Sequence, residues 1–391
     1  MPGLPNSIDL MRLCGEATIA NMKKIKCVVV TNVPAPYRVP VWKSLAKSDQ
    51  VEPHIIYCAP AHIDPTQSGV TDEYGVYFLT GKYKDYENRF MHMDLSIIKV
   101  LEKIKPDVVV TTGYIPTYLY AFAWSVVRGV PHVAMTDGTL NAERSLTKLH
   151  RVVRRLVFSQ TKSFVGACLG AKDLFLSYGI SADRIHLSPL CDDNDLFASG
   201  VSDPKYDFIF CGQFVERKNP LFAINVADGV AKRLGRTVSI RFLGKGPMEQ
   251  EIREAAQRTH GRVDLSFSGY LLQKDMPAEY AASRVFLFPT RLDCWGVVIN
   301  EACAAGVPCI VSPHTGVAGD LVIEGENGHV CELDLDTWIE RSTRLLTDKA
   351  LWTRFSLASQ TKVKQYTFDV AAQGVVDAAL QATARPRSAL P

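Results

Sequence analysis

Short apolar runs alternate along the first half of the chain with longer amphipathic segments. Seven runs of strand length predict β-strands at residues 27–31, 54–58, 76–79, 107–112, 132–136, 163–168 and 185–188. Five segments between them have the 3.6-residue period and the length of helices: 39–48, 95–104, 117–127, 146–158 and 171–178. Because the strands are apolar throughout and helices separate them, the pattern predicts a parallel sheet covered on both faces.

A second alternating series follows a polar stretch at residues 190–205, which contains Gly200 and Pro204 and is typical of a linker with few contacts. Its predicted strands are 207–211, 238–243, 264–268, 285–288 and 309–311, and its predicted helices are 220–233, 247–258 and 278–282. The fold class is therefore α/β, with two Rossmann-like domains at residues 23–195 and 196–367. An apolar helix at 368–380 opens a last segment, 368–391, whose end is polar and Pro-rich. Open α/β sheets bind ligands at the carboxyl ends of their strands, so two facing sheets predict a cleft.

Length, charge and cysteine usage narrow the class of protein. The 391 residues suffice for two cores, and a net charge of +3 without a basic, aromatic-rich run gives no sign of nucleic-acid binding. Ten cysteines without a Cys-x-x-Cys pair or a histidine cluster indicate buried thiols in a reducing compartment and no metal site. No apolar stretch approaches the roughly 18 residues of a membrane span. The charges of Asp9, Arg12 and Glu16 argue against a signal peptide. The prediction is a cytoplasmic protein with a disordered extension at residues 1–22.

The most informative stretch is 293–311, in which two carboxylates, Asp293 and Glu301, are eight residues apart. A short helix is expected at 297–305, because Gly306 suits a left-handed cap and Pro308 prevents continuation. Free backbone N–H groups at the start of this helix, at Gly296 and Val297, favour an anion such as a phosphate. An acid on either side of that anion could then hold sugar hydroxyls, although an acid near a helix start can also be only a dipole partner.

This stretch resembles the acid-x7-acid signature of glycosyltransferase family 4, retaining enzymes with the GT-B fold. The surrounding words also fit: Phe-Pro-Thr-Arg-Leu at 288–292, Glu-Ala-Cys-Ala-Ala-Gly-Val-Pro at 301–308, Gly316, and Glu-Asn-Gly at 326–328. The resemblance covers roughly residues 25–370 and points to a polysaccharide-assembly branch. It implies that the second domain binds a nucleotide-sugar donor and that the first faces the acceptor. Glu301 would contact the nucleotide ribose and Asp293 a donor-sugar hydroxyl, with Trp295, Gly296 and Val297 beside the donor. The family usually has Glu where this chain has Asp293.

Two further turns of the second domain resemble donor-binding loops of the family. Gly212 to Asn219 follows the first strand of this domain, and Lys218, with Arg217 beside it, matches a cation that neutralises the donor diphosphate. Gln213 stands where the family usually has an early arginine. Gly244 and Gly246 resemble the family's Gly-x-Gly-Pro turn near the nucleotide.

In the first domain, Pro36, Tyr37 and Arg38 lie in the loop between the first strand and the first helix, where a doubly wound fold places a ligand loop. They are candidates for contact with the acceptor or a phosphate, and simple turn chemistry is the alternative. Asp137 follows another strand and is a candidate catalytic residue facing the reacting centre.

A basic helix face marks one further candidate surface. His150, Arg151, Arg154 and Arg155 are expected on one side of their helix, with Leu149, Val152, Val153 and Leu156 opposite. Such a face suits an anionic membrane surface that carries a lipid-linked acceptor, which would make the protein peripheral, and it equally suits a solvated surface.

The resulting prediction is a retaining glycosyltransferase that moves a sugar from a nucleotide diphosphate to a saccharide or lipid-linked saccharide. Fixed cations and helix N–H groups aimed at the departing diphosphate would lower the barrier, without a metal or any other cofactor. Two alternatives stay open at this point. A GT-B protein could bind sugars or partners without turnover, and a nicotinamide-dependent oxidoreductase could use the Gly244 turn, whose dinucleotide fingerprint lacks its third glycine.

Overall fold

The structure is a computed structural model that describes residues 23–59, 70–81, 83–86, 89–143, 146–198, 204–269 and 271–384. The predicted extension at 1–22, the end of the chain at 385–391 and residues 199–203 of the predicted linker lie outside the described residues. The chain divides into two compact units. One combines Met1–Ala134 with Leu156–Ser163 and Val375–Pro391, and the other combines Met135–Arg155 with Phe164–Gly374. These units differ from the predicted domains, so the boundary at 195/196 stays a prediction.

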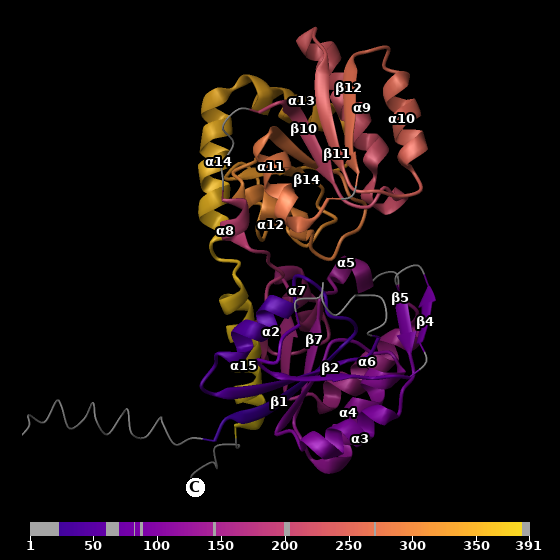
Figure 1. Ribbon diagram of the computed structural model, residues 1–391, viewed down its shortest axis with the longest axis vertical. Coiled ribbons are helices and arrows are strands. Elements are labelled where there is room, and N and C mark those ends of the chain that lie inside the picture. Colours follow the sequence, from indigo (N-terminus) through magenta and orange to yellow (C-terminus); the bar gives the residue numbers. More distant parts are fainter. Residues whose placement is uncertain are drawn as a thin grey trace, which may run out of the picture. The chain divides into compact units, whose positions relative to one another are not determined.

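The first sheet has seven strands in the order β3-β2-β1-β6-β7-β8-β9 (Figure 1). They are β1 (Ile25–Thr31), β2 (Val51–Tyr57), β3 (Gly75–Phe78), β6 (Val108–Thr111), β7 (His132–Thr136), β8 (Ser163–Gly166) and β9 (Ile185–Leu187). Strand β1 pairs in parallel with β2 and with β6, and its residues Cys27 to Val30 are fully buried. The helices connected with this sheet are α2 (Val39–Ala46), α3 (Ser96–Ile104), α4 (Pro116–Arg128), α5 (Leu140–Glu143), α6 (Lys148–Gln160) and α7 (Leu169–Ser177).

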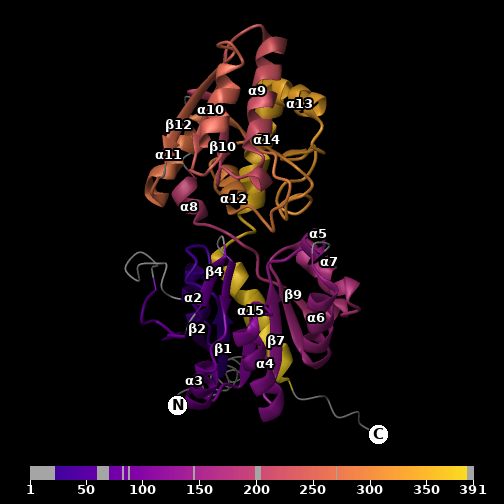
Figure 2. The ribbon, with the colours of Figure 1, turned by 90° about the vertical axis from the view of Figure 1, so that its right-hand side faces the viewer.

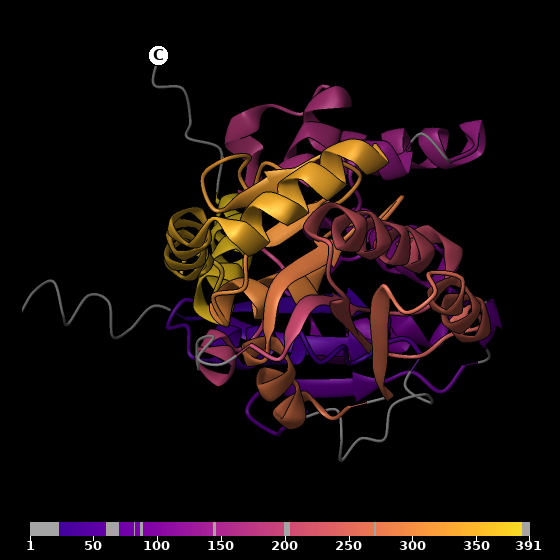
Figure 3. The same cartoon turned by 90° about the horizontal axis from the view of Figure 1, so that it is seen from above.

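The second sheet has six parallel strands in the order β12-β11-β10-β13-β14-β15. They are β10 (Tyr206–Cys211), β11 (Val238–Leu243), β12 (Val263–Gly269), β13 (Ser283–Phe288), β14 (Cys309–Val311) and β15 (Gly328–Val330). Helices flank these pink and orange strands (Figure 3). They are α9 (Pro220–Leu234), α10 (Glu249–Gln257), α11 (Met276–Ala281), α12 (Val297–Ala304), α13 (Leu335–Thr347) and α14 (Lys349–Val363). Phe208, Phe210 and Phe242 lie in its core.

The fold prediction of two parallel, Rossmann-like sheets is confirmed. The predicted strands 132–136, 238–243 and 309–311 agree with the observed bounds, and the other predicted strands differ only at their ends. The sequence patterns missed the antiparallel hairpin of β4 (Tyr83–Tyr86) and β5 (Arg89–His92), strand β15, and helices α13 and α14. α13 packs beside α9 (Figure 2), a contact that the sequence pattern cannot predict because the two helices are far apart in the chain.

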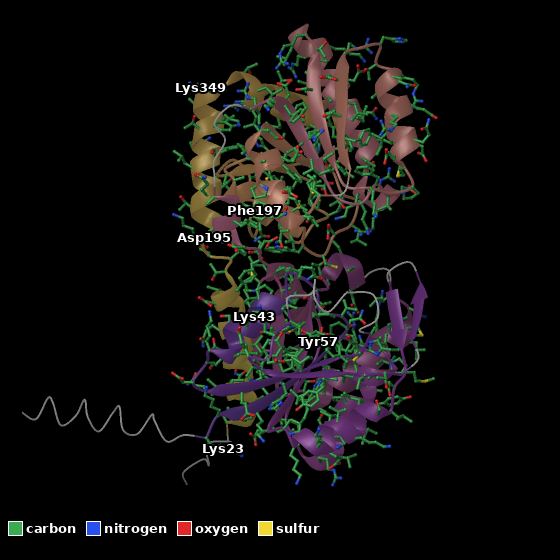
Figure 4. All side chains as sticks on the ribbon, viewed as in Figure 1. Lys23, Lys43, Tyr57, Asp195, Phe197 and Lys349 are labelled. Atoms are coloured by element: carbon green, nitrogen blue, oxygen red, sulfur yellow. The ribbon has the colours of Figure 1, made fainter. Side chains whose placement is uncertain are left out.

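The expectation that residues 190–205 form a linker with few contacts is wrong for its first part. Residues 194–197 form a short helix, α8 (Asn194–Phe197), which the Asp193 carboxylate caps by accepting from the N–H groups of Asp195 and Leu196. Phe197 is fully buried, with its ring 5.6 Å from that of Tyr280, and Figure 4 labels it on this helix. The apolar side chains between the polar ones fix this stretch to the second sheet's helices.

Helix α15 (Phe368–Thr383) packs against strands of the first sheet. The Ser163 hydroxyl of β8 donates to Gln381 Oε1 at 2.9 Å. A side chain at Gly374 would overlap the carbonyl of Leu187 in β9, so the helix backbone lies directly on that strand. Among the described residues, no helix is long and apolar enough to cross a membrane.

Candidate functional site

The loop after β10 and the loop before α12 meet at an ion pair. Lys218 Nζ bonds Asp293 Oδ2, and only 12% and 16% of the two side chains are exposed. The Lys218 ammonium also lies 4.9 Å from the centroid of the Phe288 ring at the end of β13. Two residues predicted from separate motifs, 75 positions apart, are therefore in direct contact.

The loop that carries Lys218 is fixed by its backbone. The carbonyl oxygen of Arg217 accepts bonds from Arg291 N at 2.7 Å and from Thr290 Oγ1 at 2.9 Å, both after β13. The Arg217 side chain is exposed, and its Nη2 donates to Gln213 Oε1 at 3.3 Å. Gln213 thus occupies the early cation position predicted from the resemblance and holds the neighbouring guanidinium instead.

Gly244 and Gly246 allow two loops to pack closely. A Cβ at Gly244, where φ is +126°, would overlap the carbonyl oxygen of Gly212, and one at Gly246 would lie 2.6 Å from backbone atoms of Phe214. The loops are further joined by Phe214 N, which donates to Lys245 O at 3.1 Å. Loop packing accounts for both glycines, so the nicotinamide alternative loses the feature on which it depended.

Helix α12 begins and ends as its sequence predicts. Gly296, with φ at +108°, precedes its first residue, and no side chain of the described residues caps this N-terminus. The Asp293 carboxylate instead accepts from Trp295 N at 3.4 Å, one residue outside the helix. At the other end Gly306 has φ at +73°, as a left-handed cap requires. The start of α12 is thus left without a side-chain cap, and binding of an anion by the Gly296 to Val297 backbone stays a prediction.

Glu301 is buried in a hydrogen-bonded acid pair. Tyr280 donates its hydroxyl to Glu301 Oε2 at 2.6 Å, and the Glu301 and Asp192 carboxyl groups share a hydrogen bond. Asp192 also accepts from Gln273 Nε2 at 2.7 Å. Burial, and then the Asp192 charge, raise the pKa of Glu301 well above its usual range. Glu301 therefore donates the shared proton to Asp192, whose own pKa burial also raises.

Trp295 and Cys294 differ in what they can offer a ligand. The Trp295 ring is buried, and its Nε1 donates to Asn300 Oδ1 at 2.7 Å, so this side chain packs in the core. Cys294 is partly exposed. Burial, together with the Asp137 and Asp293 carboxylates, raises the pKa of its thiol to about 11.

Cys294 was not predicted as a site residue, yet the charges of several predicted catalytic residues act on its thiol. Its thiol lies in the fields of Asp137 and Asp293 and, with opposite sign, in those of Arg217 and Lys218. Asp137 also acts on the Cys168 thiol at the start of α7. All five predicted catalytic residues belong to the second unit; the charges of four of them act on Cys294, and Glu301 lies on α12.

Pro36, Tyr37 and Arg38 belong to the other unit, in the loop before α2. Arg38 is buried at the start of that helix, Tyr37 is half-buried and Pro36 is exposed. Their contact with an acceptor or a phosphate stays a prediction.

Asp192, Tyr280 and Gln273 were also missed by the sequence reasoning. Asp192 begins the Asp-Asp-Asn-Asp run that indicated a linker, and neither of the others lies in a recognised motif. The only indication of these residues is that a buried acid such as Glu301 needs hydrogen-bonding partners, and the folded chain is required to identify them.

A pocket of about 770 Å³ is lined in part by the loop between β10 and α9, which also carries Lys218. Its lining includes Glu216, Asn219, Pro247 and Arg291, and none of the predicted donor-binding residues is part of it. In the described part of the chain, no group of three or more His, Cys, Asp or Glu side chains could hold a metal ion.

Comparison with known families places this site in a recognised domain. The family model described as glycosyl transferases group 1 matches residues 192–362, which hold every predicted donor-binding residue. The chain is 25% identical over 66% of its length to UDP-Gal:alpha-D-GlcNAc-diphosphoundecaprenol alpha-1,3-galactosyltransferase of Escherichia coli, covering 70% of that protein. It is 24% identical to D-inositol 3-phosphate glycosyltransferase of Xylanimonas cellulosilytica, over 55% of each chain. Across the first relatives the chain spans 44% to 70% of their length.

Solved structures share the whole fold. A glycosyltransferase from Rickettsia africae superposes with a TM-score of 0.72 at 12% identity, over 92% of this chain and 99% of that one. Anabaena Alr3699/HepE in complex with UDP and glucose gives a TM-score of 0.68 at 14% identity, over 90% and 98%. At such identities the likeness concerns the fold, and it confirms the predicted GT-B architecture.

Proposed function

We propose that the chain transfers a sugar from a nucleotide diphosphate to a saccharide acceptor with retention of configuration. Its GT-B fold and the match of residues 192–362 to the group 1 glycosyl transferase model support this proposal. One observation carries the proposal: Lys218 is paired with Asp293 between the diphosphate-type loop and the uncapped start of α12. A cation, a carboxylate and free backbone N–H groups in one place match the needs of a phosphate joined to a sugar.

The roles of the residues follow from the charge that develops during transfer. As the bond to the sugar breaks, the diphosphate gains negative charge, which Lys218, Arg217 and the start of α12 would stabilise more strongly than they stabilise the bound donor. Asp293 would accept a hydrogen bond from a hydroxyl of the donor sugar. Glu301, which Tyr280 and Asp192 hold by hydrogen bonds, would contact the ribose. We assign Asp137 to the acceptor side of the same centre, because its charge acts on the Cys294 thiol, next to Asp293 in the chain.

We propose further that the reaction needs neither a metal nor another cofactor. Lys218 and Arg217 would supply the positive charge that a divalent cation provides elsewhere. Donor turnover should then persist in the presence of a strong chelator.

For the acceptor we propose a saccharide linked to a lipid, with the protein in peripheral contact with an anionic membrane at the cytoplasmic side. The E. coli relative acts on a GlcNAc-diphosphoundecaprenol, as its name states. Exposed basic residues on α6 give this chain a surface suited to such a membrane.

The experiment that tests the function starts with a thermal-shift screen of UDP-, GDP- and ADP-sugars, because a ligand that binds only the folded chain raises the unfolding temperature. The stabilising donor is then incubated with candidate saccharides, and released nucleoside diphosphate and the anomeric configuration of the product are measured. We expect turnover with retention. Binding of a nucleotide sugar without hydrolysis or transfer to any acceptor would instead support a non-catalytic sugar-binding protein.

A further inference from the structure

Helix α6 exposes an apolar stripe that packs against no part of the described chain closely enough to bury it. Leu149, Val152 and Leu156 are 71%, 49% and 64% exposed, and their spacing of three and four residues places them on one side of the helix. The sequence placed these apolar residues opposite the basic ones. The buried face is formed instead by Val157 and Phe158.

A basic stripe runs alongside the apolar one. Lys148, Arg151 and Arg155 are exposed and each precedes a residue of the apolar stripe, so the two stripes lie about 100° apart around the helix. Neither Arg151 nor Arg155 has an ion pair within the described residues. The third arginine of the segment, Arg154, differs, because its Nη1 bonds Glu143 Oε2.

Arg151 and Arg155 line a pocket of about 240 Å³ together with residues of α5 and α7. Figure 2 shows the ribbons of these three helices near one another. Leu140, Glu143, Ser177 and Tyr178 complete its lining. Glu143 accepts hydrogen bonds from both Arg154 and the Tyr178 hydroxyl, so the Arg154 guanidinium already balances its negative charge. Two guanidinium groups are left to face the pocket, which therefore favours a ligand that carries about two negative charges.

The size of the pocket limits that ligand. Sites that enclose drug-sized molecules measure about 300 to 1,000 Å³, so this one suits a compact group such as a phosphate or diphosphate. Guanidinium groups bind such groups through paired hydrogen bonds. The neighbouring apolar stripe then indicates what is attached to the phosphate, since an amphipathic helix of this kind lies at the boundary between lipid headgroups and acyl chains.

We propose that the Arg151–Arg155 pocket binds the phosphate or diphosphate of a lipid embedded in the membrane, while Leu149, Val152 and Leu156 contact the lipid phase. This inference rests on the proposed function, in which that lipid bears the acceptor saccharide. It assigns recognition of the acceptor's anionic group to α6, outside the donor site of residues 192–362.

Vesicle co-sedimentation of the full chain tests the pocket. One set of phosphatidylcholine vesicles contains a polyprenyl diphosphate, a second contains phosphatidylglycerol at the same total charge, and a third contains phosphatidylcholine alone. We expect Arg151→Ala/Arg155→Ala to weaken binding to the first set by roughly tenfold or more and binding to the second set much less. Arg233→Ala/Arg258→Ala removes the same charge from other exposed helix positions and should change neither.

Two further variants separate the parts of the proposal. Leu149→Ser/Val152→Ser/Leu156→Ser should weaken binding to all vesicles, because it removes the lipid contact. Lys218→Ala should leave vesicle binding unchanged, because the donor site is not involved. If the arginine variant loses equal binding to the two anionic vesicle sets, the arginines act only through general attraction to anionic membranes and the proposed pocket is wrong. Unchanged binding of the arginine variant would also overturn the proposal.

Failure of this inference can be told apart from failure of the proposed function. Donor binding and donor hydrolysis by Arg151→Ala/Arg155→Ala should match those of the unmodified chain, because both arginines lie outside the donor site. A variant that turns over donor normally and still binds polyprenyl diphosphate vesicles would refute the pocket alone. Absence of donor turnover in the unmodified chain would refute the function.

Discussion

Replacing Glu301 with glutamine tests the buried proton that the structure assigns to this side chain. Burial and the neighbouring Asp192 raise the pKa of Glu301 well above its ordinary value of 4.5. Above that ordinary value the unfolded chain has released this proton, whereas the folded chain still holds it. The contribution of Glu301 to the free energy of unfolding must therefore fall as pH rises from about 4.5 towards the raised pKa.

The size of the effect follows from the proton count. One proton held in the folded state corresponds to about 1.4 kcal/mol per pH unit. Glutamine cannot ionise, and its amide can donate to Asp192 and accept from Tyr280 as the protonated acid does. Glu301→Gln should therefore remove this part of the pH dependence and unfold less easily than the unmodified chain near neutral pH.

Urea unfolding followed by circular dichroism between about pH 5 and about pH 8 measures the difference. Glu301→Ala is the matched control, because it also removes the proton but leaves Tyr280 and Asp192 without their partner, and it should be less stable throughout. If Glu301→Gln and the unmodified chain lose stability in parallel as pH rises, Glu301 is ionised in the folded state and the assignment is wrong. Calorimetric donor binding of the same variant then reports on the ribose contact separately.

Three further predictions concern the donor loops. Lys218→Ala should lower kcat by roughly 10² or more with a smaller change in KM, because the charge of the leaving group develops during reaction; steady-state kinetics that show only a raised KM would contradict this. Gly244→Ala should lower both Tm and donor affinity, because its Cβ would overlap Gly212, whereas Gly235→Ala meets open space and should cost only the strain of its positive φ. Alkylation of Cys294, followed by mass spectrometry, should accelerate with pH up to about 11 and slow when donor is bound; a rate that levels off near the pKa of an ordinary thiol would refute the raised value.

The sequence predicted the fold well because its strongest signals are local. Apolar runs such as 309–311 are buried throughout, so the strand bounds follow from the pattern of residues alone. Helices α13 and α14 were missed although each begins at an aspartate cap, Asp334 and Asp348. No ligand motif drew attention to that region, and their packing on the second sheet depends on residues far away in the chain.

Only those residues of the candidate site that lie in recognisable sequence motifs were predicted. Lys218 and Asp293 were each identified from their own loops, but their contact depends on how β10 and β13 pair in the sheet. Asp192 could not be identified, because its role arises from the burial of Glu301 more than a hundred residues later. The polar run around Asp192 indicated a linker, and the apolar residues beside it, such as the buried Phe197, were the hint that this stretch packs.

The observed contacts also imply how a donor would enter. Lys218 and Arg217 already have partners, Asp293 and Gln213, so a diphosphate must replace existing interactions instead of meeting unpaired charges. A phosphate that takes Lys218 leaves the Asp293 carboxylate without its cation, and a half-buried carboxylate needs new donors. The hydroxyls of the donor sugar can supply them, whereas the ionised diphosphate of the product offers only acceptors. The pair therefore favours the intact donor over the product, and restoring the Lys218–Asp293 bond would help to release the nucleotide once the sugar has gone.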